Sequence, residues 1–408
     1  MKKHPAHIDI SNSNNKTIKE SYHEINRGHG GTDPKIASNY LQDSNAKMRL
    51  LFWETTAGCN LECVHCRRLD VSRKLMESDL NFEEAKQLVD QIVSVGKPIF
   101  VLSGGEPLMR PDIFDIADYA TKSGLTVAMA TNGTMITSEV AKKIKSSGIQ
   151  RVSVSLDGAT ADIHDKFRKL DGSFDRAIEG IKHVQDVNVS TQINSTIAKH
   201  NVHQVKDLYR NAIDLKCDAL HIFMLVPVGC GVEIEKDQSL DALTYEKVLN
   251  WFYEVSLERK IETKATCAPH YFRIMRERAK ADNIEVTTKT HGMAAMTKGC
   301  LAGQSICFVS HKGEIFPCGY FPLEVGNVKH DNLTDVWSNS EVFQKLRNQE
   351  NLTGKCGACD YKEVCEGCRA RAYFYTDGDY LSEEPYCIYE PPAWQVAKVG
   401  EDLKIIKK

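Results

Sequence analysis

Three cysteines stand close together early in the chain, at a spacing that suits the ligation of a metal or a cluster. Cys59, Cys63 and Cys66 occur in the run CNLECVHC, directly after the apolar run LLFWETT. Four thiolates would fill a tetrahedral zinc site or complete the usual ligation of an iron–sulfur cluster. Three on one short loop can hold a 4Fe–4S cluster and leave one iron open to a substrate or cofactor. A three-cysteine zinc loop, or cysteines buried for packing, are the alternatives.

A second and larger set of cysteines occupies the C-terminal part of the chain, between residues 300 and 387. The set comprises Cys300, Cys307, Cys318, Cys356, Cys359, Cys365, Cys368 and Cys387. Eight ligands suit two four-cysteine 4Fe–4S clusters, but paired CxxC motifs are also typical of zinc ribbons. Outside both sets, Cys217 is expected to be a packed thiol, and Cys230 to be buried or near a ligand.

The composition limits the partners and the compartment that we expect. The chain has 408 residues, 42% of them hydrophobic, which is enough for two or three domains. Its 52 basic and 55 acidic side chains give a net charge of −3, so no overall field favours nucleic acid or an anionic membrane. No apolar run is long enough to span a membrane, and the N-terminal run lacks the apolar core of a secretory signal. We therefore expect a cytoplasmic protein, in which the 14 cysteines are poor disulfide candidates.

Short β-rich runs alternate with amphipathic helical patterns between residues 49 and 239. Six runs are typical of strands: LLFWETT, PIFVLSG, LTVAMAT, RVSVSLDG, VSTQINSTI and ALHIFMLV. Segments between them, such as FEEAKQLVDQIVSVG, carry apolar residues at helical spacing and end in glycine. Six βα units predict an α/β fold with a parallel sheet and right-handed crossovers, two units short of a full barrel.

The remaining chain is expected to form four further segments. Residues 1–48 are polar and aperiodic, which predicts a flexible leader, or alternatively a flap that orders over a ligand. Residues 240–297 carry mostly helical patterns and would bridge to a cysteine-rich domain over 298–390. A C-terminal tail would cover residues 391–408.

Polar and glycine residues follow most of the predicted strands, at what would be one edge of the sheet. Ligand-bearing loops gather at that edge of parallel sheets. Two glycines in SGGEP let the backbone approach a ligand, while a serine and an aspartate two residues apart in SVSLDG can hold ribose hydroxyls. An arginine in HDKFR can pair with a carboxylate. The residues expected around this site are His65, Gly104, Gly105, Glu106, Thr131, Asn132, Ser155, Asp157, Arg168, Asn194 and Leu225.

The cysteine spacing, together with the later SGGEP turn, resembles the radical S-adenosylmethionine (SAM) enzymes. The resemblance implies a partial (β/α)6 barrel in which the open iron of a 4Fe–4S cluster binds SAM. It also implies reductive cleavage of SAM to methionine and a 5′-deoxyadenosyl radical, which takes a hydrogen atom from a C–H bond. Cys59, Cys63 and Cys66 would be the catalytic cluster ligands. His65 would lie near adenine, the GGE run would accept the SAM ammonium, and Arg168 would pair with the SAM carboxylate.

The later cysteines resemble the SPASM extension of that superfamily, which carries auxiliary clusters. The resemblance implies interleaved ligands: Cys300, Cys307, Cys318 and Cys368 on one 4Fe–4S cluster, and Cys356, Cys359, Cys365 and Cys387 on the other. Two residues separate the last two cysteines of the CxxC run, where the family usually has three. This departure leaves open whether the chain carries one auxiliary cluster or two.

The runs KATCAPHYFRIMRER, GCRARA, DYLSEEPYC and LVPVG resemble one branch of the superfamily, the haem synthases of the alternative haem pathway. The resemblance implies that two propionates of iron-coproporphyrin III become the vinyl groups of haem b. The radical would take a hydrogen from the carbon β to the carboxylate, and the substrate radical would then lose CO2 and one electron. An auxiliary cluster is the expected electron acceptor, and a low-potential flavodoxin or ferredoxin is the expected donor.

A substrate with four carboxylates needs cationic contacts, and a porphyrin iron accepts axial ligands. The cations near the motifs are Arg67, Arg68, Lys264, Arg273, Arg276, Arg369 and Arg371, and we single out Arg67, Arg273 and Arg369 as substrate contacts. Cys267 and His270 are candidate iron ligands, since thiolate and imidazole are usual axial ligands of haem. A core or helix-capping role is the alternative for His270.

Three other functions remain possible on the sequence alone. A sibling enzyme that modifies another tetrapyrrole, didecarboxysirohaem, would carry the same motifs. A SPASM enzyme that modifies a ribosomal peptide would need a peptide-binding domain before the barrel, where this chain has a short unpatterned segment. An iron–sulfur electron-transfer protein would have no use for the GGEP turn, Ser155 or Asp157.

Overall fold

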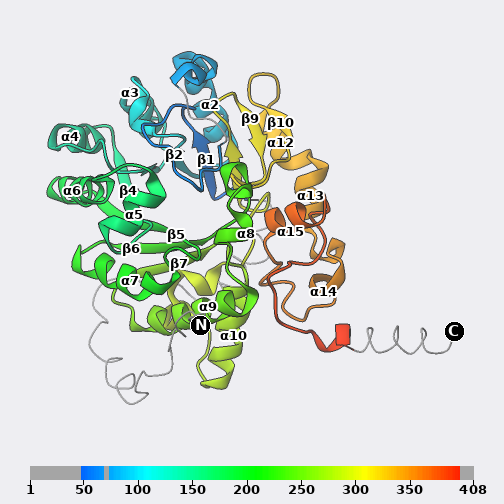
Figure 1. The fold of residues 1–408 in the computed structure, drawn as a ribbon. Helices are drawn as coiled ribbons and strands as arrows, with labels where there is room; N and C mark the ends of the chain where they lie inside the picture. The colour runs from blue at the N-terminus through cyan, green and yellow to red at the C-terminus, as the bar shows by residue number, and fades with distance from the viewer. Residues whose placement is uncertain (1–46, 69–72, 396–408) are drawn as a thin grey trace.

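One ten-stranded sheet organises the protein, as seen in the computed structural model, which describes residues 47–68 and 73–395 (Figure 1). The predicted leader lies almost wholly outside these residues, as does most of the predicted tail. The strand order is β10-β9-β8-β1-β2-β3-β4-β5-β6-β7. The strands are β1 (Leu50–Glu54), β2 (Ile99–Ser103), β3 (Val127–Thr131), β4 (Ile149–Ser155), β5 (Ser190–Ile197), β6 (Ala219–Met224), β7 (Glu262–Thr266), β8 (Ile306–Val309), β9 (Glu314–Phe316) and β10 (Gly326–Asn327).

The six predicted strands are confirmed as β1 to β6, and each pairs in parallel with the next. Both edges of the sheet stay open, so the barrel is partial, as expected. The α-helices of the barrel half are α2 (Phe82–Ser94), α3 (Ile113–Lys122), α4 (Ser138–Ser146), α5 (Ala161–Arg168), α6 (Ser173–Asp186), α7 (Val205–Asp214), α8 (Glu235–Gln238) and α9 (Ala242–Glu258). They are followed by α10 (His270–Ala281), α11 (Thr288–His291), α12 (Leu333–Asn339), α13 (Glu341–Arg347), α14 (Gly354–Gly357) and α15 (Arg369–Tyr375).

Helix α2 shows how the sequence positions these helices on the outside of the sheet. Asn81 caps it and forms a reciprocal capping box with Glu84, which satisfies backbone donors that a helix start leaves unpaired. Its apolar residues recur at helical spacing, so Leu88 and Ile92 share the buried face while the acidic first turn is exposed. Figure 1 shows α2, α3, α4 and α6 arranged along the outer side of the curved sheet.

The segment over 240–297 contains a strand that the helical patterns did not predict. Glu262–Thr266 forms β7, which pairs in parallel with β6. Its sequence, ETKAT, is short and mostly polar, and therefore gives no signal that distinguishes a strand from a loop. The neighbouring helices α9 and α10 follow the predicted patterns.

The cysteine-rich part of the chain extends the same sheet. β8 pairs in parallel with β1, and β9 and β10 follow in antiparallel register. Sequence neighbours usually pair, and β8 lies far from β1 in the sequence, so this junction could not be predicted from local patterns. The domain boundary expected near residue 298 therefore does not interrupt the sheet.

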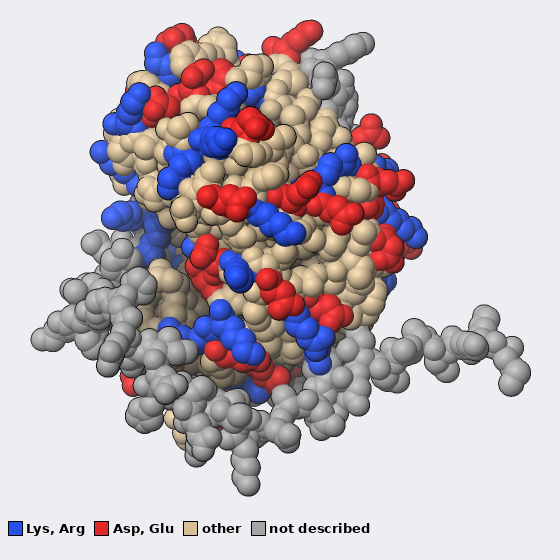
Figure 2. Space-filling view, turned by 90° about the vertical axis from the view of Figure 1, so that its left-hand side faces the viewer, with Lys and Arg blue, Asp and Glu red and all other residues tan. Residues whose placement is uncertain are grey.

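Two properties of the described part of the chain bear on membranes and on charged partners: the apolar length of its helices and the charge on one face of its surface. No helix within residues 47–68 and 73–395 is long and apolar enough to cross a bilayer. Basic and acidic side chains are interspersed on the face shown in Figure 2, as the near balance of charges predicts.

Candidate active site

The three-cysteine loop directly follows β1. Cys59, Cys63 and Cys66 are all partly exposed, and the thiols of Cys63 and Cys66 act electrostatically on that of Cys59. Burial raises the pKa of Cys59 to about 12, and burial also raises the pKa of the other two thiols. Three thiols on one loop whose pKa values are all raised become thiolates only when a cation takes up the charge, which fits iron ligation.

The loop is fixed against the turn that follows β6. The backbone N–H of Cys230 donates to the carbonyl of Cys66 over 2.8 Å, and its thiol lies 3.0 Å from the carbonyl of Arg68. Gly229 has φ +56, and a Cβ there would lie 2.1 Å from the carbonyl oxygen of Arg67. Only glycine fits this approach. Cys230, whose role the sequence left open, therefore supports the cysteine loop.

The SGGEP turn after β2 is joined to the same loop. The N–H of Gly105 donates to the carbonyl of Thr56 over 2.9 Å, and the N–H of Glu106 donates to the carbonyl of Gly58 over 2.8 Å. Gly104 has φ +150, and a Cβ on Gly105 would lie 2.2 Å from the Gly58 oxygen. The two glycines thus make a narrow backbone cradle beside the cysteines, which fits an ammonium ligand that needs carbonyl acceptors.

Glu106 is fully buried and clamps β2 to β3. Its carboxylate accepts hydrogen bonds from the Thr131 hydroxyl over 2.7 Å and from the Asn132 N–H over 2.8 Å. The Asn132 amide reaches the side chain of Asn60 over 2.8 Å, inside the cysteine loop. The side chains of Glu106, Thr131 and Asn132, expected as cofactor contacts, thus hold the loops of the site together.

Asp157 and Arg168 form a buried ion pair, 2.5 Å apart, beneath the cysteine loop. The Arg168 guanidinium also lies 3.6 Å from the Cys63 sulfur. Burial opposes ionisation of Asp157, but Arg168 and then His65 outweigh it and lower the pKa of Asp157 to about 2. Both residues were expected to contact SAM, one at the ribose and the other at the carboxylate. In the structure they satisfy each other, because α5 ends directly over the end of β4.

His65 extends a stack of three rings beside that ion pair. Its ring stacks on Phe167 at 4.3 Å, and Phe167 stacks on His200 at 3.7 Å. Burial lowers the pKa of His65 to about 3, so its imidazole is neutral near pH 7. The neutral, stacked ring fits an expected neighbour of adenine. Ser155, the last residue of β4, pairs in register with Asn194, which lies within β5, and Leu225 follows β6.

The arginines proposed as substrate contacts mostly have internal partners. Arg273 pairs with Glu246 and Glu277 and is buried, and Arg369 donates to the carbonyls of Tyr380 and Ser382. Arg67 pairs with Glu54 and stacks over Phe308, although its side chain stays 24% exposed. Of these three candidates, only Arg67 keeps a surface that a propionate can reach. Arg371 is also buried, paired with Glu384.

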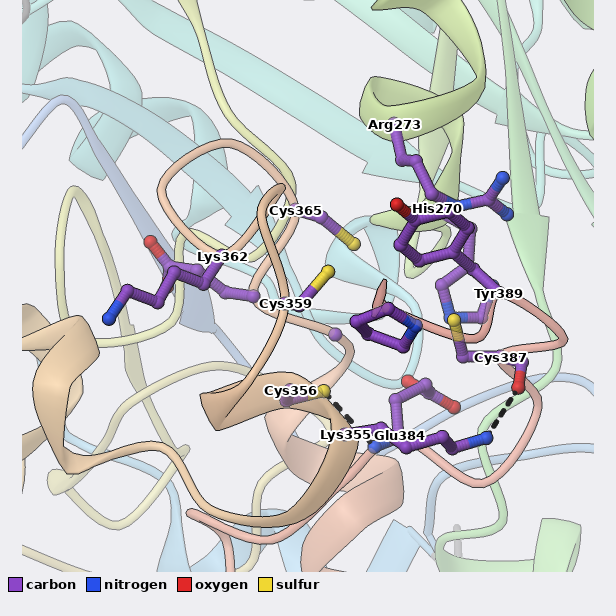
Figure 3. Close-up of a pocket in the computed structure, with 13 residues that line it drawn as sticks. His270, Arg273, Lys355, Cys356, Cys359, Lys362, Cys365, Glu384, Cys387 and Tyr389 are labelled. Carbon is purple, nitrogen blue, oxygen red and sulfur yellow. Dashed lines mark hydrogen bonds between the residues drawn. The ribbon is translucent and has the colours of Figure 1, made fainter. Parts of the chain in front are cut away.

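One expected cysteine group surrounds a single cavity. Cys356, Cys359, Cys365 and Cys387 line one cavity, shown with its other lining residues in Figure 3. The Lys355 ammonium donates to the Cys387 carbonyl over 2.9 Å and fixes that end of the chain. Burial, and then the charge of Cys387, raises the pKa of Cys365 well above its usual value. Four convergent thiols around one cavity fit the ligand set of a 4Fe–4S cluster.

The other expected group is not brought together as the sequence suggested. Cys307 is fully buried in β8, in the main hydrophobic core with Leu51 and Val309. Its thiol lies 3.8 Å from the carbonyl of Phe316, and no cysteine is among the groups that shift its pKa. The pairing of β8 with β1 therefore places Cys307 in the main core, apart from the hydrophobic cluster of Cys300, Cys318 and Cys368.

Cys267 occupies the neighbourhood where Cys307 was expected. It packs in a second hydrophobic cluster that also includes Cys300, Cys318 and Cys368. No group of three His, Cys, Asp or Glu side chains in the described ranges converges tightly enough for a single metal ion. Sequence reasoning missed this grouping because helices α10 and α11 separate Cys267 from the motif cysteines along the chain. The KATCAPH run indicated that Cys267 is a candidate ligand, but it did not indicate which cysteines lie beside it.

Comparisons with known proteins agree with this organisation. Residues 53–212 match the family model of the radical SAM superfamily, and residues 300–369 match that of an iron–sulfur cluster-binding domain named SPASM. The fold is similar to that of Streptococcus suis SuiB bound to its precursor peptide SuiA, with a TM-score of 0.67, 18% identity, and coverage of 90% of this chain and 84% of that one. That likeness concerns the fold alone.

Similarity in sequence is much higher to a group of named enzymes. The chain is 52% identical over 343 residues to the AdoMet-dependent heme synthase of Methanosarcina barkeri, which covers 84% of this chain and 97% of the relative. It is 45% identical to the AdoMet-dependent heme synthase of Nitratidesulfovibrio vulgaris, over 86% of this chain and 95% of the relative. Identity to the Fe-coproporphyrin III synthase of M. barkeri is 30%, over 88% and 92%. The chain therefore belongs to the radical SAM superfamily and, within it, to the family of the AdoMet-dependent heme synthases.

Proposed function

We propose that this protein oxidatively decarboxylates two propionates of iron-coproporphyrin III to vinyl groups and so produces haem b. The observation that carries the proposal is the 52% identity over nearly the full length of a relative named AdoMet-dependent heme synthase. The cysteine loop, the glycine cradle fastened to it and the cysteine groups of the later domain support it.

Different residues of the barrel would bind the cluster, SAM and the substrate. Cys59, Cys63 and Cys66 would hold the 4Fe–4S cluster, and the Gly104–Gly105 backbone would accept the SAM ammonium. When bound, the cluster and SAM supply a 5′-deoxyadenosyl radical that removes a hydrogen atom from a C–H bond. The neutral His65 ring would lie against adenine, and Arg67 would contact one substrate carboxylate.

The substrate chemistry requires an electron acceptor at every turnover. Hydrogen removal at the carbon β to a carboxylate leaves an unpaired electron next to the bond that must break. The C–C bond to the carboxylate then breaks, CO2 leaves, the vinyl double bond forms, and one electron is released. The cysteine groups after the barrel provide sites for clusters that can take this electron.

The reductant and the compartment follow from the same chemistry. We propose a low-potential flavodoxin or ferredoxin as the electron donor to the cysteine loop. All 14 cysteines are free in the structure, which suits a reducing, cytoplasmic compartment.

Anaerobic turnover followed by mass analysis tests the proposal. Protein reconstituted with iron and sulfide is incubated with SAM, a reductant and iron-coproporphyrin III. We expect a product that has lost CO2 and two hydrogen atoms from each of two propionates. Cys217→Ser, which changes a thiol in the core of the barrel, should form the same product as the parent protein. Conversion of didecarboxysirohaem alone would assign the sibling reaction, and SAM cleavage without any tetrapyrrole turnover would contradict the proposal.

A further inference from the structure

Three cysteines of the later domain share one hydrophobic cluster and lack their expected fourth partner. Cys300, Cys318 and Cys368 lie together, and the charges of Cys300 and Cys368 act on the Cys318 thiol. Cys307, assigned to them from the motif, is buried in the other core. The fourth corner of a cluster here is either open or filled by another side chain.

Cys267 is the cysteine that the structure brings to this group. Its side chain packs in the same hydrophobic cluster, and Cys368, Cys318 and Cys300 are all among the charges that act on its thiol. It comes from the loop between β7 and α10, whereas the other three come from the later domain. The barrel and the later domain thus meet at the hydrophobic cluster in which these four cysteines pack.

The backbone of Cys267 is held in an unusual conformation that fixes this position. Its φ is +54, which a residue with a Cβ adopts only when its surroundings require it. The Arg371 guanidinium donates to the Cys267 carbonyl over 2.7 Å, and the Tyr245 hydroxyl donates to it over 3.0 Å. Arg371 lies in α15, which is capped by Cys368. One buried arginine therefore ties Cys267 to the start of the helix that carries another member of the group.

We infer that Cys267, and not Cys307, is the fourth ligand of the cluster held by Cys300, Cys318 and Cys368. The inference rests on the auxiliary clusters of the proposed function and adds one ligand from outside the later domain. With four thiolates this cluster has no open iron, so it serves as an electron carrier. Cys267 is then not available to bind the porphyrin iron.

The test isolates the auxiliary clusters from the radical chemistry. In the background Cys59→Ala/Cys63→Ala/Cys66→Ala, purified under anaerobic conditions, we expect about eight irons, four for each auxiliary 4Fe–4S cluster. Cys267→Ala and the matched control Cys307→Ala are introduced separately. Iron content and the electron paramagnetic resonance (EPR) spectrum of the reduced protein are recorded with and without added cyanide, a ligand for an open iron.

We expect the iron content or the EPR spectrum to change in Cys267→Ala and to stay unchanged in Cys307→Ala. Cys267→Ala should lose about four irons, or retain them with an EPR signal that cyanide shifts, while Cys307→Ala should match the background in both readouts. If Cys267→Ala does not fold, Cys267→Ser keeps an oxygen ligand and should retain the iron with an altered signal. An unchanged, cyanide-insensitive spectrum for the Cys267 variants, or these changes in Cys307→Ala, would overturn the inference. Since haem formation is not measured, failure of the proposed function is detected separately, by turnover of the intact enzyme.

Discussion

Cys267 and His270 lie three residues apart, yet they face two different cysteine groups. Cys267 packs with Cys300, Cys318 and Cys368, whereas His270 lines the cavity of the four remaining cysteines of the later domain. His270 is fully buried, and within the described residues neither ring nitrogen has a hydrogen-bond partner. The segment 267–270 at the start of α10 therefore connects the two sites along a path of a few covalent bonds. In place of the expected ligation of a porphyrin iron, we propose that these two residues act between the clusters.

The first prediction concerns the unpaired ring of His270. His270 shares that cavity with four cysteines and with Glu384, and an imidazole N–H that donates to a cysteine sulfur or to the bound cluster would raise the reduction potential of that cluster. His270→Phe should therefore lower the reduction potential of one auxiliary cluster. The free energy of its one-electron reduction should become less favourable by roughly 1 kcal/mol, the net contribution of one hydrogen bond. An EPR-monitored redox titration measures this potential in the background Cys59→Ala/Cys63→Ala/Cys66→Ala. The exposed His330, changed to Phe, is the control, and equal potentials in the two variants would rule out the contact.

The second prediction concerns the cysteine loop. Intact protein prepared anaerobically should contain about twelve irons, and Cys63→Ala should contain about eight, at four irons per cluster. Because the loop supplies three ligands, losing one should abolish reductive SAM cleavage while the later domain keeps its iron. Iron analysis and the yield of 5′-deoxyadenosine check both statements. Stoichiometric zinc in place of the eight irons would identify the later domain as a zinc module.

The third prediction concerns the ion pair of Asp157 and Arg168. Asp157→Asn leaves a buried guanidinium without its counter-charge, which costs about 3–5 kcal/mol in the free energy of unfolding at pH 7. The pKa of Asp157 is lowered to about 2, so the stability that this group contributes is complete above its unfolded pKa, near 4. It is lost as the pH falls through about 2. Urea titrations should therefore show a smaller difference between parent and variant at pH 3 than at pH 7, and a constant difference would exclude this origin.

The fourth prediction separates SAM cleavage from substrate oxidation. Cys365 lines the cavity that it shares with Cys356, Cys359 and Cys387, and none of the three loop cysteines lines that cavity. Cys365→Ala should still produce 5′-deoxyadenosine in the presence of substrate, whereas vinyl formation should fall because the electron has no acceptor.

Cluster ligation also contributes to folding, so circular dichroism and retained SAM cleavage serve as the controls for Cys365→Ala. A folded variant that makes haem at the parental rate would show that the cluster is not the required acceptor.

Much of the fold was predictable because most barrel strands are short β-rich runs, and several are followed by an amphipathic helix that ends near a glycine. β7 escaped prediction because ETKAT is polar, and the pairing of β8 with β1 escaped it because the partners are distant in sequence. The cysteine loop and the SGGEP turn were correctly expected to meet, since both follow neighbouring parallel strands.

The site was less predictable where a charged side chain can contact either a ligand or an internal partner of opposite charge. Arg168, Arg273, Arg369 and Arg371 read as cationic contacts in the sequence, but each has a carboxylate or a set of carbonyls beside it. An arginine that is buried pairs internally, and whether it is buried depends on tertiary packing. The place of Cys267 depended on the same packing, through Arg371.

The parallel pairing of β8 with β1 also fixes an order of events during synthesis. β1 is among the first described segments to leave the ribosome, but one of its edges stays unpaired until Ile306–Val309 has emerged. An unpaired, apolar strand edge is a template for association with other chains. Nascent or truncated chains that end before β8 are therefore expected to aggregate and to need a chaperone, so the later domain protects the barrel from misassembly as well as carrying clusters.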